Sequence, residues 1–225
     1  MDCNVAVHLY TWRLTPHCDD DLALLSTEEK HRYITYKHAL SATRYVAARA
    51  GLRRRLGAYL NINPASLQID HTPLGKPFLR HLFHCHFSLS HCADNAVLVV
   101  AEVPVGVDLE ALPVQDWKGL AQHILSTDEH DHLHSCASEE QAHFLIKYWT
   151  AKESIVKACG LGLQLPVQLI EINHDFRQPI LPPDVINLIG DEWKIEVSDY
   201  GVDRILAVCV QCPPSQRYTI ISRDI

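Results

Sequence analysis

Hydrophobic positions in the first half of the chain follow two different periods. Residues 5–12 alternate loosely between apolar and polar side chains, which predicts a strand. The sequence Ser26-Thr27-Glu28-Glu29 is typical of a helix N-cap and predicts a helix to about residue 37. Apolar residues at helical spacing predict a longer helix over 41–60, and short apolar runs between turn residues predict strands at 67–70, 78–79, 87–90, 96–102 and 105–109. We therefore expect a helical layer against a mostly antiparallel sheet.

The second half repeats this order of elements. Helices are predicted around residues 117–125 and 139–159, and strands at 169–172, 193–197 and 204–209. Leu112-Pro113 interrupts the pattern, so we divide the chain into halves at 1–111 and 112–225. The expected fold class is α+β, with two similar α/β halves and the site at their interface, because ligand sites favour such interfaces.

Composition and charge exclude several classes of protein. The chain of 225 residues is 47% hydrophobic and 21% charged, as globular proteins are. Its formal net charge of −7 argues against a general nucleic-acid binder, which is usually basic where it binds. No apolar run approaches the roughly 20 residues that cross a bilayer, and the first residues lack the basic segment of a signal peptide. We expect a cytoplasmic protein that binds neither nucleic acid nor membrane.

Cysteine and histidine are frequent but do not form a recognised metal motif. The 8 cysteines are scattered, which in a chain of this size indicates free thiols rather than a disulfide framework. We interpret Cys209 and Cys212 as the end of a strand that runs into Pro213. Of the 15 histidines, six lie in clusters at 81–86 and 130–134 without a cysteine or carboxylate at a structural zinc spacing, so most of these are interpreted as surface residues.

Two acidic residues end an apolar strand. Asp108 and Glu110 lie two positions apart, so the alternation of a strand points both carboxylates to the same face. A divalent cation would relieve their repulsion, and hard oxygen ligands at this spacing suit Mg²⁺. Taken alone, the pair is better interpreted as the solvated polar face of an antiparallel strand.

The helix over 139–159 carries a third carboxylate. An apolar stripe formed by Phe144, Tyr148, Ala151, Ile155 and Ala158 defines its buried face. Glu153 and Lys157 project together from the opposite side because they lie four residues apart, and Gly160 is a natural helix end. The two side chains form either a surface ion pair or a metal carboxylate with a cation that reaches for a phosphate.

Both segments resemble the signature motifs of one family. GVDLE at 106–110, followed by WTAKESIVKACGLGL at 149–163, looks like the two motifs of the 4′-phosphopantetheinyl transferases. Gly75-Lys76-Pro77, FSLSHC at 87–92, and residues 26–32 with Arg44 match further family segments. The matches extend from residue 26 to 166, and the size and two-half organisation resemble the monomeric surfactin-synthetase-activating (Sfp) type.

The resemblance implies an activity and its catalytic groups. The reaction is transfer of phosphopantetheine from coenzyme A to a serine hydroxyl of an apo acyl or peptidyl carrier protein, with release of 3′,5′-ADP. Asp108, Glu110 and Glu153 would hold Mg²⁺ on the pyrophosphate of coenzyme A. Glu153, directly or through water, would accept the serine proton, and Lys157 would contact the pyrophosphate oxygens. These groups suit phosphoryl transfer, which needs positioning and charge neutralisation more than covalent help.

The resemblance also implies a site for the nucleotide end of coenzyme A. Arg44, Ser90 and His91 would bind the 3′-phosphate, and Lys76 would lie near the adenine and ribose. Glu29 stands where family members often carry a lysine and cannot bind a phosphate, so Arg32 would supply the cation there. Ser88 and Cys92 replace an Asn and a Ser of the family pattern by other small polar residues.

A docking surface for an acidic carrier must attract it locally, because this chain is acidic too. One candidate is a basic patch made of Arg49, Arg53, Arg54 and Arg55. The alternative is that these arginines form an ordinary solvated helix face. The docking element that we favour is an apolar surface around Leu120, Ile124 and Leu125, where many family members have Phe-Phe.

Two other functions use the same carboxylates. A Mg²⁺-dependent phosphohydrolase would have water attack in place of the serine, but the Ser90-His91 and Gly75-Lys76-Pro77 segments would then have no role. A non-catalytic module that binds coenzyme A or a carrier would not need the third carboxylate, Glu153.

Overall fold

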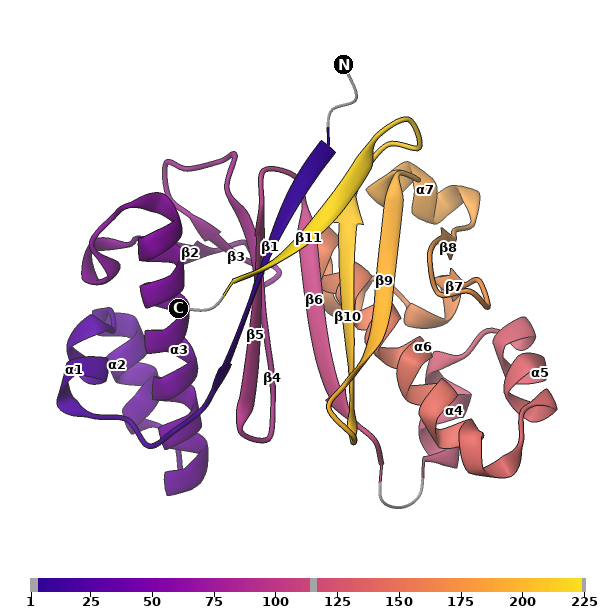
Figure 1. Ribbon diagram of the computed structural model, residues 1–225, viewed down its shortest axis with the longest axis horizontal. Coiled ribbons are helices and arrows are strands. Elements are labelled where there is room, and N and C mark those ends of the chain that lie inside the picture. The colour runs from indigo at the N-terminus through magenta and orange to yellow at the C-terminus, as the bar shows by residue number, and fades with distance from the viewer. Residues whose placement is uncertain (1–3, 114–116, 224–225) are drawn as a thin grey trace.

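Two α/β halves lie side by side in the computed structural model, which describes residues 4–113 and 117–223 (Figure 1). Helices flank two central sheets on opposite sides of the molecule. The structure is therefore α+β, as predicted. Among the described residues, no helix is both long enough and apolar enough to cross a membrane.

The first sheet has the strand order β11-β1-β5-β4. Its strands are β1 (Asn4–Arg13), β4 (His86–Cys92), β5 (Asn95–Ala101) and β11 (Arg217–Arg223). The β1–β5 and β4–β5 pairs are antiparallel, whereas β11 lies parallel to β1. Helices α1 (Asp19–Leu24), α2 (Thr27–Ile34) and α3 (Ala39–Leu60) lie beside this sheet, and the hairpin of β2 (Ile69–His71) and β3 (Pro77–Leu79) follows α3 in the chain.

The second sheet has the order β6-β10-β9 and is antiparallel throughout. It consists of β6 (Val105–Ala111), β9 (Trp193–Tyr200) and β10 (Arg204–Gln211). Helix α6 (Ser138–Cys159) packs on β6 and β10. The remaining elements lie around α6 and are α4 (Lys118–Ile124), α5 (Thr127–Ser135), β7 (Glu171–Ile172), β8 (Pro179–Ile180) and α7 (Pro183–Ile189).

The chain exchanges strands between the two halves. Strand β6 precedes the boundary that we placed at residue 112, yet it pairs with β10 of the second sheet. Strand β11 comes from the end of the chain and pairs with β1. Apolar residues of both sheets, including Val7, Val99, Val107 and Val208, form one buried cluster between them. This burial joins the halves into one body, because each sheet covers the apolar face of the other.

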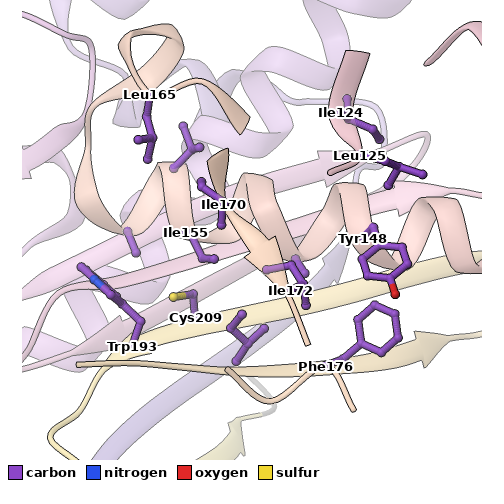
Figure 2. Close-up of a cluster of buried hydrophobic side chains, with 14 of the residues drawn as sticks. Ile124, Leu125, Tyr148, Ile155, Leu165, Ile170, Ile172, Phe176, Trp193 and Cys209 are labelled. Carbon is purple, nitrogen blue, oxygen red and sulfur yellow. The ribbon is translucent and has the colours of Figure 1, made fainter. Parts of the chain in front are cut away.

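A second core holds α6 against its sheet. Figure 2 shows Trp193 and Cys209 below Ile155, with Ile170 above it and with Tyr148 and Phe176 at one end of the cluster. The apolar stripe predicted for α6 is confirmed, because Tyr148, Ala151 and Ile155 are fully buried. Helix α6 is therefore fixed along its length, which fixes the direction of the polar side chains that it carries.

A buried ion pair ties the neighbouring helices to α6. The Lys152 ammonium donates to Glu129 Oε2 at 2.6 Å and to the Ile124 carbonyl at 2.6 Å. Glu129 also accepts from the backbone N–H groups of Ser126 and Ile172 at 2.8 Å each. Both side chains are fully buried, so α5, α6 and β7 meet at one satisfied polar junction.

Most predicted elements are found, with several differences. Helices α1, α5 and α7 and strands β8 and β11 were not predicted, and the strand expected at 169–172 is limited to β7 because residues 167–169 form a 3-10 turn. The apolar docking element is wrong in part: Ile124 and Leu125 are 2% and 3% exposed and pack in the core, which leaves Leu120 at the surface.

The basic patch on α3 is also wrong. Arg53 and Arg55 are buried, and Arg49 is largely covered. Arg53 pairs with Glu29, while the Arg55 guanidinium stacks 4.2 Å from the centre of the Trp12 ring. Arg54 is exposed and pairs with Asp21. These arginines are therefore held by ion pairs and an aromatic contact within the helical layer and do not form an exposed basic surface.

Candidate active site

Strand β6 approaches α6 closely at Gly106. A Cβ atom there would lie 2.0 Å from the Ser154 carbonyl oxygen and 2.5 Å from the Ala158 nitrogen. Glycine is therefore required for this contact. Asp108 and Glu110 share the face of Gly106 because strand positions two apart point the same way. The close approach brings both acids toward Glu153 and Lys157 on α6.

Asp108 is the centre of a buried polar group. Its Oδ1 accepts hydrogen bonds from the Ser90 hydroxyl at 2.9 Å and from the Lys157 ammonium at 2.5 Å. Lys157 also donates to the Ser90 hydroxyl at 3.0 Å. Three predicted site residues from β4, β6 and α6 thus meet in direct contact. The other oxygen, Asp108 Oδ2, is buried and has no hydrogen-bond partner among the described residues.

Serine hydroxyls on β4 connect the two sheets at this point. Ser88 Oγ accepts from the Val107 backbone N–H at 3.2 Å, and Ser90 Oγ accepts from the Leu109 N–H at 3.3 Å. Both serines are buried. Ser90 was predicted as a phosphate ligand, and here its hydroxyl positions Asp108.

The other two carboxylates interact electrostatically with Asp108. Burial, followed by the charge of Asp108, raises the pKa of Glu110, and the same two causes raise the pKa of Glu153. The Trp149 indole donates to Glu110 Oε1 at 3.2 Å. Within residues 4–113 and 117–223, no three His, Cys, Asp or Glu side chains already stand close enough together to hold a metal ion.

A cavity of about 690 Å³ opens beside these groups, between the two halves. Its wall includes Glu153, Lys157 and Trp149 of α6, and Lys76 and Pro77 of the β2–β3 hairpin. Lys76 spans the interface, because its ammonium donates to the Ala158 carbonyl near the C-terminal end of α6. Burial lowers the pKa of Lys76. The cavity therefore has a carboxylate and two amines from different halves on its wall.

The remaining predicted phosphate ligands lie outside the cavity wall. Arg44 donates to Asp94 Oδ1 from Nε at 3.1 Å and from an Nη at 2.7 Å. Partial burial and the charges of Lys157 and Arg44 lower the pKa of His91, which shows that Lys157 and Arg44 lie within electrostatic reach of that ring. Arg32 is exposed and its guanidinium lies 5.7 Å from the centre of the Tyr45 ring. These roles stay predictions.

Sequence reasoning did not assign four polar residues of the cavity wall to the site, namely Arg49, His71, His123 and Gln168. Arg49 was assigned to a basic patch, and His71 was not singled out. Arg49 follows Arg44 by five residues and therefore lies on a different face of the same helix. This difference in face was the only indication in the sequence that Arg49 could line the cavity.

Comparison with known proteins identifies the class of protein. Residues 104–209 match the sequence model of the 4′-phosphopantetheinyl transferase superfamily. The chain is 33% identical over 167 residues to 4′-phosphopantetheinyl transferase HetI of Nostoc sp., a match that covers 70% of each protein. It is 29% identical over 157 residues to 4′-phosphopantetheinyl transferase gsp of Aneurinibacillus migulanus, covering 70% of this chain and 65% of the relative.

A solved structure is also similar. The ACPS–coenzyme A complex of Chronobacterium ammoniagenes aligns with a TM-score of 0.38 and 19% identity, over 48% of this chain and 94% of that chain. The chain belongs to the 4′-phosphopantetheinyl transferase superfamily, and the family resemblance of its two motifs is confirmed.

Proposed function

We propose that this protein transfers 4′-phosphopantetheine from coenzyme A to a serine hydroxyl of an apo carrier protein and releases 3′,5′-ADP. The observation that carries the proposal is the meeting of Asp108 and Lys157 beside Glu153, next to a cavity between the halves. The relatives HetI and gsp are named as transferases, which supports transfer and gives no support to the phosphohydrolase alternative.

We infer that Asp108, Glu110 and Glu153 hold Mg²⁺. Asp108 Oδ2 is a buried acceptor without a partner among the described residues, and a cation would satisfy it. Burial, and after it the charge of Asp108, raises the pKa values of Glu110 and Glu153, and a bound cation would offset both effects. An all-oxygen donor set suits a hard cation. When bound, Mg²⁺ would neutralise negative charge on the pyrophosphate of coenzyme A.

Two side chains of α6 have separate roles in the proposed reaction. The serine oxygen forms a bond to the phosphorus that carries pantetheine, and the bond from that phosphorus to the bridging oxygen breaks. The bridging oxygen leaves as part of 3′,5′-ADP. Glu153, on the cavity wall, accepts the serine proton directly or through water. Lys157, also on the wall, stabilises the charge that develops on the leaving phosphate.

The nucleotide end of coenzyme A would lie toward the first half. Lys76 lines the cavity beside Pro77, and we expect it to contact the adenine and ribose. Arg44, Ser90 and His91 are candidates for the 3′-phosphate because His91 lies within electrostatic reach of Arg44 and Lys157, and Ser90 contacts Lys157. Arg32 is a further candidate cation. The partner in this proposal is an acyl or peptidyl carrier protein, and we expect a monomer in the cytoplasm.

A mass measurement tests the proposed function. The purified protein is incubated with coenzyme A, Mg²⁺ and an apo carrier, and the intact carrier is weighed by mass spectrometry. We expect the carrier to gain one phosphopantetheine unit and 3′,5′-ADP to accumulate in equal amount. Hydrolysed coenzyme A with an unchanged carrier would instead assign a phosphohydrolase, and the absence of any turnover over a panel of apo carriers would contradict both enzymes.

A further inference from the structure

Glu29 is buried in the helical layer and its carboxylate accepts three hydrogen bonds. Its Oε1 accepts from Arg49 Nε at 2.6 Å, and an Nη of Arg49 lies 2.5 Å from the same oxygen in the ion pair. Its Oε2 accepts from Arg53 Nε at 2.7 Å and from the Ser26 backbone N–H at 2.8 Å. Burial raises the pKa of Glu29, but these donors outweigh burial and hold it below its ordinary value. The carboxylate is therefore ionised and fully used inside the protein.

The two arginines that Glu29 holds have different surroundings. Arg53 is almost fully buried, and its Nη1 donates to the Leu67 carbonyl at 3.0 Å and the Pro64 carbonyl at 3.3 Å. Its guanidinium thus serves the fold. Arg49 retains 12% of its side-chain exposure and lines the cavity. Among the described residues, Glu29 is its only hydrogen-bond partner, so its Nη1 remains available for a ligand.

This corner of the cavity carries net positive charge. One carboxylate faces two guanidinium groups, which leaves one positive charge on the Glu29–Arg49–Arg53 group. His71 lies on the same wall, and partial burial followed by the charges of Arg49 and Arg32 lowers its pKa. A neutral imidazole and a fixed guanidinium on one wall suit an anionic oxygen.

We propose that Glu29 is a positioning residue for coenzyme A: it holds the Arg49 guanidinium on the cavity wall, where Arg49 donates to a phosphate of the bound nucleotide. The inference rests on the proposed function. From the sequence we expected Glu29 to weaken this edge of the site, because a carboxylate cannot bind a phosphate. Instead, Glu29 holds the Arg49 guanidinium there. An arginine held in place by an ion pair is already ordered, so less entropy is lost when it binds a ligand.

Direct binding and kinetics test the assignment of Arg49. The Kd of coenzyme A is measured by calorimetry, and KM and kcat are measured with a saturating apo carrier, for the parent and for Arg49→Met. We expect Arg49→Met to raise both Kd and KM about tenfold or more, with kcat within about twofold of the parent. The matched control is Arg54→Met, which removes a neighbouring exposed arginine of α3 and should keep the parent's Kd. An Arg49→Met protein with the parent's Kd would overturn the proposal.

A double-mutant cycle tests the positioning role of Glu29. Glu29→Gln should raise KM for coenzyme A about threefold to tenfold in the parent, and should have no further effect in the Arg49→Met background. A merely structural role would give the same rise in both backgrounds and would overturn the assignment. Should Glu29→Gln fail to fold, Arg49→Lys replaces it. A lysine keeps the charge but cannot contact Glu29 Oε1 through two nitrogens as Arg49 does, so this variant should reproduce the rise in KM. A parent that binds coenzyme A but modifies no carrier would contradict the proposed function alone.

Discussion

The Lys157 ammonium lies 2.5 Å from Oδ1 of Asp108 and joins the end of α6 to the edge strand of the second sheet. Lys157 is about one-third exposed, whereas Asp108 is buried. The lysine can therefore contact a ligand in the cavity while it still neutralises the acid behind it. The same pair places the helix that carries Glu153 beside the strand that carries Glu110.

Gly106→Ala should separate these two elements. The added Cβ would collide with backbone atoms of Ser154 and Ala158, which cannot move like the end of a flexible side chain. We expect the free energy of unfolding to fall by about 1–3 kcal/mol. We also expect transfer activity to fall, because β6 and α6 carry the catalytic side chains. Urea denaturation and the carrier assay measure the two effects. Gly119→Ala in α4, where a Cβ meets no atom within 4 Å, is the control and should lower neither the stability nor the activity.

Lys152→Met should destabilise the protein strongly. It leaves the Glu129 carboxylate buried without its cation, and breaking a buried pair in this way costs about 3–5 kcal/mol. Adding Glu129→Gln to Lys152→Met should recover part of the loss, because the remaining group is then neutral. Thermal unfolding measures both changes, and Lys147→Met, at a partly exposed position of α6, is the control. Equal stability of Lys152→Met and Lys147→Met would show that the pair contributes nothing.

Local patterns predicted most of the elements and the carboxylates. The alternation around Asp108 and the spacing of Glu153 and Lys157 each define one face of one element, so they can be seen in the sequence. The capping box at Ser26–Glu29 likewise depends on residues three apart, and it is present as predicted.

Contacts between distant segments could not be predicted in this way. Helix α5 begins with a capping box at Ser126–Glu129, but its few apolar residues gave no helical stripe, and its stability comes from the junction at Glu129. Strand β11 lacks a signal because its partner, β1, lies at the other end of the chain. The role of Glu29 in α2 depends on Arg49 and Arg53 of α3. The spacing of residues within one helix cannot show a contact between two helices.

Arg44 should contribute to the affinity for coenzyme A. Arg44→Ala is expected to raise KM for coenzyme A by about one to two orders of magnitude, and to reduce the preference for coenzyme A over 3′-dephospho-coenzyme A. Asp94→Asn should leave stability nearly unchanged, because the Arg44–Asp94 pair is partly exposed. It should not weaken coenzyme A binding, because it frees the Arg44 guanidinium. An Arg44→Ala enzyme with the parent's full preference would remove Arg44 from the site.

The Glu29 ion pairs should make stability depend on pH. The pKa of Glu29 is lower in the folded protein than in the unfolded chain, so the unfolded state binds the extra proton. The stabilisation is therefore present above the unfolded pKa of about 4.3 and is lost as pH falls through the lower, folded pKa. Glu29→Gln should lower the Tm at pH 7, and the gap between parent and variant should narrow on acidification below about pH 4. A gap that stays constant from pH 7 to pH 3 would contradict this origin of the stabilisation.

Asp108→Asn tests the central claim most directly, because it removes the charge at the centre of the site and keeps the shape of the side chain. The parent and the variant are incubated side by side with coenzyme A, Mg²⁺ and the same apo carrier, and the mass of the carrier is followed with time. Circular dichroism checks that both proteins are folded. We predict that the parent adds one phosphopantetheine unit per carrier and that the folded variant is slower by at least about a hundredfold. A folded Asp108→Asn protein that modifies the carrier at the parent's rate would contradict the account.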